Sequence, residues 1–363
     1  MLGEDTEEDQ KGTFNGAPVL GRIAVVAAGP FFNFLLAFFL ALIIVGCMGY
    51  DPAEVLSVQE GSAAEAAGLQ EGDLITRYQG YRIHFGRDIY VYRYLNPVTE
   101  EPVTLTVERD GTTHEITYTP DLDVRYLLGF NRKDTGALEV VSLIEGLPLE
   151  AAGLQEGDVI TSINGVEIPD NEAYQAYLDE YPLSDEPVQI TYERDGESFE
   201  VEITPEKYTS VVNGFSYNTG SVKTDSVLEV VKYSALEVDY MIRTTILSLK
   251  ELLTGHLGLK ELSGPVGVVD AIGSTYQAVK KEGPLIIWMN MLNMALMLSA
   301  DLGVMNLLPI PALDGGRLVF LILEAIRRKP INRQVEGSIH FAGLMLLMAL
   351  MVVVMYNDIL KIF

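Results

Sequence analysis

The pattern of apolar and polar positions divides the chain into helical and β-rich parts. Long apolar runs cover residues 23–48, 286–308 and 341–355. A helix of about 20 apolar residues can cross the ~30 Å hydrocarbon layer of a membrane. From Asp51 to Ser210, short alternating segments are separated by Gly and Asp turns, which is typical of strands. The pattern predicts a multi-pass α-helical membrane protein with an inserted β-rich (α+β) part.

The runs set the expected boundaries. We expect a first stretch over 1–22, transmembrane helices over 23–48, 286–316 and 339–357, and a basic loop over 317–338. Residues 226–262 place apolar side chains at helical spacing among charged ones, which predicts an amphipathic helix that lies on the membrane. Ser263 to Gly267 predicts a turn.

The second apolar run ends in an unusual way. Pro309 and Pro311 interrupt it and bring Asp314 beside two glycines. A break of this kind frees backbone carbonyls, and a carboxylate at the bilayer centre costs about 2.5–3.5 kcal/mol. Asp314 is therefore either part of a functional site or a helix stop in the headgroup zone. Asn33, in the first run, has two similar readings: a hydrogen bond between helices or a role in chemistry.

The β-rich part contains an internal duplication. Ala67 to Thr76 returns as Ala152 to Thr161, and Glu108 to Gly111 returns at the same offset of 85 residues. The duplication predicts two domains, at 51–123 and 124–210. In each copy a glycine ends a short helix, and Asp-Gly predicts a two-residue hairpin.

The distribution of charged residues argues against one class of function and predicts the orientation of the chain in the membrane. The net charge is −26, and residues 51–210 hold 33 acidic against ten basic side chains. An acidic surface argues against nucleic-acid binding. The single cysteine, Cys47, excludes internal disulfides and a thiolate zinc cluster. Basic residues in the 317–338 loop predict that this loop is cytoplasmic, which places the β-rich domains outside the cell.

Each repeat resembles a PDZ domain, a module that binds extended peptides at a sheet edge. In the second copy, Leu128, Gly129 and Phe130 resemble the loop whose N–H groups receive a peptide carboxylate. The first copy has no clear counterpart before Val55. The domains either bind peptide tails or act as spacers and filters.

Several motifs together resemble the bacterial site-2 proteases, intramembrane zinc metalloproteases that include the regulator of sigma-E protease. They are Met1 to Asp5, Ala28 to Asn33, Leu262 to Gly267, Asn306 to Gly316 and Tyr356 to Asp358. The resemblance implies that Asp314 is a Zn²⁺ ligand and that the protein lies in the bacterial plasma membrane. It also implies that Asn306, Pro309, Pro311 and Gly315 hold the substrate.

The histidines depart from that family. Its members carry a His-Glu-x-x-His helix that supplies two zinc ligands and the catalytic Glu. Here the histidines are His84, His114, His256 and His340, and no two are four apart. We therefore expect no catalytic residue in this chain. Either the chain or gene model is N-terminally truncated or, alternatively, the protein is a natural inactive homologue. Zn²⁺ is then expected only for the full-length protein.

A second departure is Asp301, where the family has an uncharged polar residue. Protonation, a hydrogen bond to Asn306 or a wet cavity would each accommodate this carboxylate, and we expect a structural or gating role.

Two functions follow from these observations. The first is a zinc-dependent intramembrane protease that cuts a single-span membrane substrate, such as an anti-sigma factor or a remnant signal peptide. The alternative is an inactive membrane adaptor that binds peptides through its PDZ pair.

Overall fold

The computed structural model describes all residues except 1–13, 15, 259–261, 330 and 363. The Met1 to Asp5 motif therefore lies outside the described residues. The chain forms two compact units. The helical unit combines the described parts of Met1–Pro52 with His84–Asp88 and Thr219–Phe363, and the β-rich unit combines Ala53–Ile83 with Ile89–Asn218.

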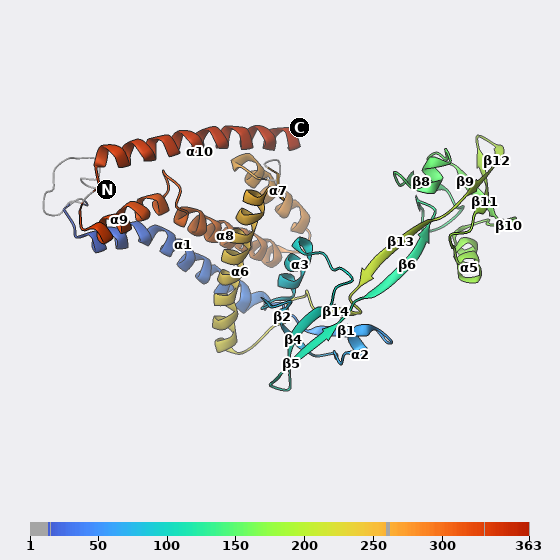
Figure 1. Cartoon of the computed structure of the whole chain (residues 1–363), viewed down its shortest axis with the longest axis horizontal. Helices are drawn as coiled ribbons and strands as arrows, with labels where there is room; N and C mark the ends of the chain where they lie inside the picture. The colour runs from blue at the N-terminus through green and yellow to red at the C-terminus, as the bar shows by residue number, and fades with distance from the viewer. Residues whose placement is uncertain (1–13, 15, 259–261, 330, 363) are drawn as a thin grey trace. The chain divides into compact units, whose positions relative to one another are not determined.

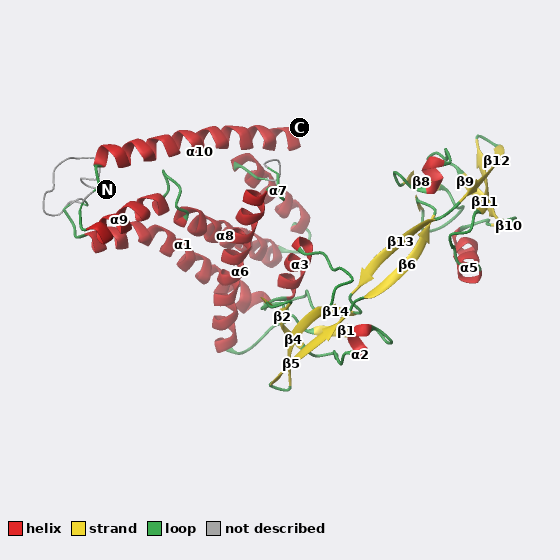
Figure 2. Ribbon diagram, in the orientation of Figure 1, coloured by secondary structure: helices red, strands yellow, loops and turns green. Residues whose placement is uncertain are grey.

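Helices make up most of the first unit (Figures 1 and 2). They are α1 (Val19–Met48), α6 (Val227–Thr254), α7 (Pro265–Val279), α8 (Pro284–Leu307), α9 (Asp314–Arg327) and α10 (Arg333–Ile362). Among the described residues, three segments are long and apolar enough to cross a membrane: α1, α8 and Gln334–Lys361 of α10. The three apolar runs are therefore confirmed as helices.

Small residues bring α1 and α8 close together. Ala37 and Ala41 of α1 are fully buried against Leu296 and Ala300 of α8. Gly303 allows the same approach, because a methyl group there would lie 2.6 Å from the ring of Phe34. Without a strong hydrophobic drive between apolar helices in lipid, such close backbone packing is a main source of their association.

The amphipathic helix packs onto this pair. In α6, Val238 and Met241 join the cluster formed by α1 and α8. The helix ends at Thr254, where Gly255 adopts a left-handed cap with φ +79°. It is therefore shorter than the expected 226–262, because the glycine cap satisfies its last carbonyls.

Two segments expected to be irregular are helical. The Ser263 to Gly267 turn runs directly into α7, because Pro265 is well suited to the first helical position. The expected 317–338 loop includes most of α9 and the start of α10. In α9 the basic residues flank an apolar stretch, and Arg22 of α1 pairs with Glu324 at 2.6 Å. The basic residues lie near the two ends of α9, and the apolar residues between them follow the spacing of a helix.

The β-rich unit repeats one plan twice. The first copy contains β1 (Val55–Val58), α2 (Ala63–Ala66), β2 (Leu74–Tyr78), β3 (Tyr81–Arg82), α3 (Gly86–Leu95), β4 (Val103–Arg109) and β5 (Thr112–Tyr118). The second contains β7 (Phe130–Arg132), β8 (Val140–Leu143), α4 (Pro148–Ala151), β9 (Val159–Ile163), β10 (Val166–Glu167), α5 (Asn171–Glu180), β11 (Val188–Arg194) and β12 (Glu197–Ile203). Their four-stranded antiparallel sheets have the equivalent orders β3-β2-β4-β5 and β10-β9-β11-β12.

The Asp-Gly signals are hairpins, as expected. Asp110 and Gly111 both have positive φ, at +50° and +74°, and Asp195 and Gly196 repeat this at +54° and +81°. Positive φ at both central residues gives the turn a twist that matches the flanking strands. The turns join β4 to β5 and β11 to β12.

The closing strand of the first copy comes from the far end of the second copy. In the second copy, β7 pairs with β8. The corresponding partner of β1 is β14 (Phe215–Tyr217), which follows the whole second copy. A ribbon of β6 (Asp121–Leu127) and β13 (Glu206–Val212) connects the copies. We call β1–β5 with β14 the first repeat domain and β7–β12 the second repeat domain. The second is inserted into the first, so the residues that complete the first domain extend beyond 51–123.

Candidate functional site

The broken apolar run forms a compact turn. Helix α8 ends at Leu307, and α9 begins at Asp314. At this position the carboxylate is favoured by the free N–H groups of the helix N-terminus. A methyl group on Gly29 of α1 would lie 3.2 Å from Asp314 Oδ2. The structure therefore brings the Ala28 to Asn33 motif and the Asp314 motif together.

The glycines after Asp314 are required by packing. A methyl group on Gly315 would lie 2.2 Å from the Leu308 carbonyl oxygen, and one on Gly316 would lie 2.5 Å from that of Ile310. Contacts below 3.0 Å with backbone force the chain to move. The turn thus folds back onto the first residues of α9, and only glycine fits there.

A histidine of α10 supports the same turn. Ala312 has φ +82°, a conformation that alanine rarely adopts, and its N–H donates to His340 Nδ1 at 2.9 Å. Gly343, one turn along α10, would place a methyl group 2.5 Å from Pro311. The sequence assigned no role to His340. A histidine within an apolar run, with a glycine one turn away, is the pattern that could have indicated its contact with this turn.

The predicted substrate-binding residues surround this turn in different settings. Asn306 lies half-buried in the last turn of α8. Pro309 is exposed and Pro311 is half-buried. Gly315 is buried against the turn's carbonyls.

Asp314 is the only predicted metal ligand, and its surroundings do not complete a zinc site. Among the described residues, no group of three His, Cys, Asp or Glu side chains could hold a metal ion. A zinc site in proteins has at least three such ligands. The described residues therefore do not fit a zinc ion by themselves.

The polar groups inside the helix cluster have partners. Asp301 Oδ1 accepts a hydrogen bond from Thr245 Oγ1 of α6 at 2.6 Å. Ser299 Oγ donates to the Asn33 carbonyl at 2.8 Å. Asp301 thus joins α8 to α6, and Thr245 is its partner in the described structure.

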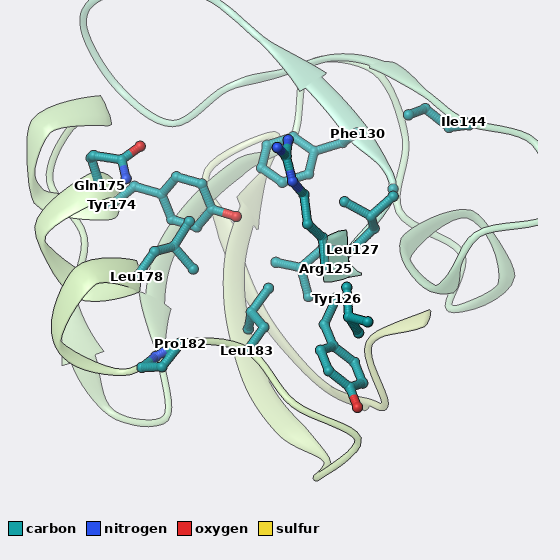
Figure 3. Close-up of a pocket in the computed structure, with 13 residues that line it drawn as sticks. Arg125, Tyr126, Leu127, Phe130, Ile144, Tyr174, Gln175, Leu178, Pro182 and Leu183 are labelled. Carbon is teal, nitrogen blue, oxygen red and sulfur yellow. The ribbon is translucent and has the colours of Figure 1, made fainter. Parts of the chain in front are cut away.

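The three predicted peptide-binding residues lie together in the second repeat domain. Leu128, Gly129 and Phe130 line a cavity of about 490 Å³. Gly129 has φ +97°, and a methyl group there would lie 2.2 Å from the Leu147 side chain. Figure 3 shows Tyr174 of α5 on the other side of this cavity. The helix residues were missed in the sequence, because only the fold brings them to the loop.

The first repeat domain has the equivalent groove. Asn213, Gly214 and Phe215 line a cavity of about 420 Å³ together with Arg93. They stand 85 residues after Leu128 to Phe130, at the duplication offset. The missing counterpart of the loop is therefore present, after the second copy instead of before Val55. The repeated Gly-Phe pair was the signal that could have found it.

Comparison with known proteins assigns the chain to a family. The sequence model described as peptidase family M50 matches residues 1–350. The chain belongs to peptidase family M50.

Curated relatives are named as zinc metalloproteases or as a regulatory protease. A zinc metalloprotease RasP from Shouchella clausii is 42% identical over 232 residues, which cover 62% of this chain and 52% of that protein. A zinc metalloprotease RasP from Geobacillus kaustophilus is 37% identical over 241 residues, covering 62% and 54%. The regulator of sigma-W protease RasP from Bacillus subtilis is 38% identical over 216 residues, covering 58% and 48%. The chain spans about half the length of these curated relatives.

Among solved structures, the HtrA3 PDZ domain bound to a phage-derived ligand matches 24% of this chain and 92% of its own, with 16% identity and a TM-score of 0.21.

Outside the three long apolar helices, the M50 chain carries a buried ionic cluster. Arg87 pairs with Asp51 at 3.3 Å and with Glu237 of α6, and Arg243 of α6 pairs with Asp88 at 3.0 Å. Burial raises the pKa of Glu237 and of Asp51, and the charge of Arg87 offsets part of each rise. The cluster fixes His84–Asp88 onto α6 within the helical unit.

Proposed function

We propose that this M50 chain serves a zinc-dependent intramembrane protease in which Asp314 is one zinc ligand. The supporting observation is the contact between Asp314 and Gly29, which brings two family motifs together at the break between α8 and α9. The family resemblance implies that a His-Glu-x-x-His helix supplies the other ligands, and these would come from outside the described residues. Zinc, when bound, would supply an activated water for peptide hydrolysis.

The chain's own residues would position that chemistry. Gly315 and Gly316 keep the turn close to α9, and His340 holds Ala312. Together they would fix the direction of the Asp314 carboxylate. Asn306, Pro309 and Pro311, with Gly315, would receive an unwound stretch of substrate, since Pro309 and Pro311 have no N–H to close a helix there.

We further propose a multi-pass protein in the plasma membrane of a bacterium. The three apolar helices support this placement. Arg327 ends α9, and Arg328 and Lys329 follow it before α10, which favours a cytoplasmic position for that connection and an outer position for the repeat domains. A single-span membrane protein is the proposed substrate, such as an anti-sigma factor or a remnant signal peptide. The relative named regulator of sigma-W protease agrees with that class.

The repeat domains would bind peptide tails as a PDZ pair. The two grooves, each formed by a positive-φ glycine loop and a helix, support this role. They also support a second candidate function, an inactive membrane adaptor that captures peptides without cutting them. That candidate is favoured by the incomplete metal site among the described residues.

Cleavage of a single-span reporter in bacterial membranes separates the two functions. The chain is expressed joined to a His-Glu-x-x-His helix from a family member. The protease proposal predicts cleavage that Asp314→Ala abolishes and Asp301→Asn, a carboxylate change in α8, retains. Cleavage that survives Asp314→Ala would remove this residue from the metal site. No cleavage by the joined wild-type protein would favour the adaptor.

A further inference from the structure

The two repeat domains share a backbone plan but differ in the chemistry of their grooves. Two groove-lining positions related by the 85-residue offset carry the difference, and two more related positions lie in the domain cores. The second domain has the aliphatic residues Leu128, Leu178, Ile163 and Ile203, and the first has the polar residues Asn213, Arg93, Tyr78 and Tyr118. The polar residues are all hydrogen-bond donors.

Three of these polar groups are buried without a normal hydrogen bond. Both amide atoms of Asn213 and the hydroxyls of Tyr78 and Tyr118 have no partner among the described residues. Asn213 is only 6% exposed. Burial raises the pKa of the Tyr78 hydroxyl, and the nearby Asn213 amide offsets part of that rise. The two side chains do not have the geometry of a normal hydrogen bond. Buried polar groups are nearly always paired in folded proteins, so the amide of Asn213 in the groove wall is suited to meet a ligand.

Arg93 gives the cluster a positive charge. It lies half-buried on α3 and lines the cavity with Asn213. Burial raises the pKa of Tyr118, and the charge of Arg93 offsets part of the rise, so the guanidinium lies close to the tyrosine cluster. The second groove is lined by Arg125 of the connecting strand β6, which is 69% exposed and paired with Asp123 at 2.6 Å, and Arg132 lies over the Tyr174 ring. A half-buried arginine on the groove helix, where the second copy has Leu178, is therefore a feature of the first domain.

The donor set defines the matching group. The guanidinium of Arg93 and the amide NH₂ of Asn213 both line the groove and both donate, and an ionised carboxylate only accepts. Hydrogen bonds between such charged partners are about twice as strong as neutral ones. The Gly214 loop, with φ +74°, repeats the Gly129 loop and would receive the terminal carboxylate of a peptide. Arg93 stands where Leu178 lines the second groove, so it would meet a side chain of that peptide.

We propose that the first repeat domain binds peptide C-termini whose last side chain is a carboxylate, through Arg93 and Asn213, whereas the second binds C-termini with an apolar last side chain. The pair would then recognise two different peptide ends. This inference rests on the proposed peptide-binding function of the repeat domains.

Fluorescence anisotropy with the full chain in detergent tests the proposal. The probes are labelled ten-residue peptides that differ only in the last residue: Glu, Gln or Leu. Loss of a charged hydrogen bond predicts that Arg93→Leu weakens the Glu peptide about 10- to 100-fold and leaves the Leu peptide unchanged. Arg93→Lys, which keeps the charge, retains part of the affinity. Arg82→Leu, the same change at an exposed arginine of this domain, has no effect.

The reciprocal variant tests the second groove. Leu178→Arg is expected to weaken the Leu peptide about tenfold or more, because it places a charge in an apolar groove. Hydrogen exchange of β4 and β11 confirms that each variant remains folded. Equal affinity for the Glu and Gln peptides, or no effect of Arg93→Leu, would overturn the inference alone. If no peptide binds the wild-type chain, the proposed peptide-binding function fails as well.

Discussion

The duplicated ion pair of the repeat domains gives a prediction that each copy controls for the other. Asp158 is 1% exposed and accepts hydrogen bonds from Arg194 Nε at 2.7 Å, Arg194 Nη2 at 2.6 Å and the Gln155 N–H at 2.8 Å. In the first domain, Asp73 makes the same contacts with Arg109 and the Gln70 N–H. The perturbation is Asp158→Ala, with Asp73→Ala as its matched partner.

The magnitude follows from what remains buried. Removing one partner of a buried ion pair costs about 3–5 kcal/mol. The side chain of Arg194 is 25% exposed and can turn toward water, so we expect about 2–3 kcal/mol. Since each 1.4 kcal/mol is a factor of ten, amide protection in β11 and β12 should fall about 30- to 150-fold.

Hydrogen exchange measured by mass spectrometry reads both domains in one sample. Asp158→Ala should lower protection in β11 and β12 and leave β4 and β5 unchanged, and Asp73→Ala should do the reverse. Equal loss in both domains, or none, would refute the account of two independently stabilised copies.

The same pair predicts a pH dependence. Burial acts to raise the pKa of Asp158, but hydrogen bonds from Arg194 and the Gln155 N–H outweigh it and hold the pKa below its usual value. The folded domain thus binds fewer protons than the unfolded chain in acid. The stabilisation is complete above the unfolded pKa, about 3.9, and is lost as pH falls through the folded pKa. The acid loss of protection in the second domain should be shallower in Asp158→Ala.

Three further changes test the helical unit. Gly315→Ala should lower thermal stability by about 1–3 kcal/mol, because its methyl group would overlap a carbonyl. Gly273→Ala in α7 has open space around it and should be neutral or stabilising. Equal effects of the two substitutions on stability would contradict this prediction. Because burial raises the pKa of Glu237, the folded state binds more protons, so protection of His84–Asp88 should fall as pH rises from about 4.3 through the folded pKa. Glu237→Gln should flatten that dependence, and an unchanged slope would exclude this group. Asp358→Ala removes the acceptor of the Gly264 N–H, at 2.9 Å, and should speed amide hydrogen exchange at the start of α7. Unchanged exchange there would show that Asp358 does not cap this helix.

Much of the architecture could be predicted because it depends on local pattern. Apolar run length predicted the three long helices, and the 85-residue offset predicted two equivalent sheets. The Asp-Gly hairpins followed from the backbone preferences of glycine and aspartate. Leu128 to Phe130 lie together at a cavity, because the loop and its glycine are adjacent in sequence, and their peptide-binding role stays a prediction.

Contacts between distant segments could not be predicted in the same way. Strand β14 closes the first domain from 157 or more residues along the chain, and pairing of that kind leaves no local signal. The partner of Asp301 is Thr245, on a helix that the charge pattern placed on the membrane without specifying which face meets α8. Residues 317–338 were assigned to a loop on their charge alone, although the apolar positions between Arg317 and Arg327 recur at helical spacing.

Zinc content tests the central claim most directly. The chain joined to a His-Glu-x-x-His helix is purified and its metal measured, beside Asp314→Ala and Asp301→Asn. We expect about one zinc per wild-type and Asp301→Asn chain and a large loss in Asp314→Ala, because a three-ligand site loses its carboxylate. The 363-residue chain alone should hold no stoichiometric zinc. Equal zinc in the wild-type and Asp314→Ala proteins would contradict the assignment of Asp314 as a ligand.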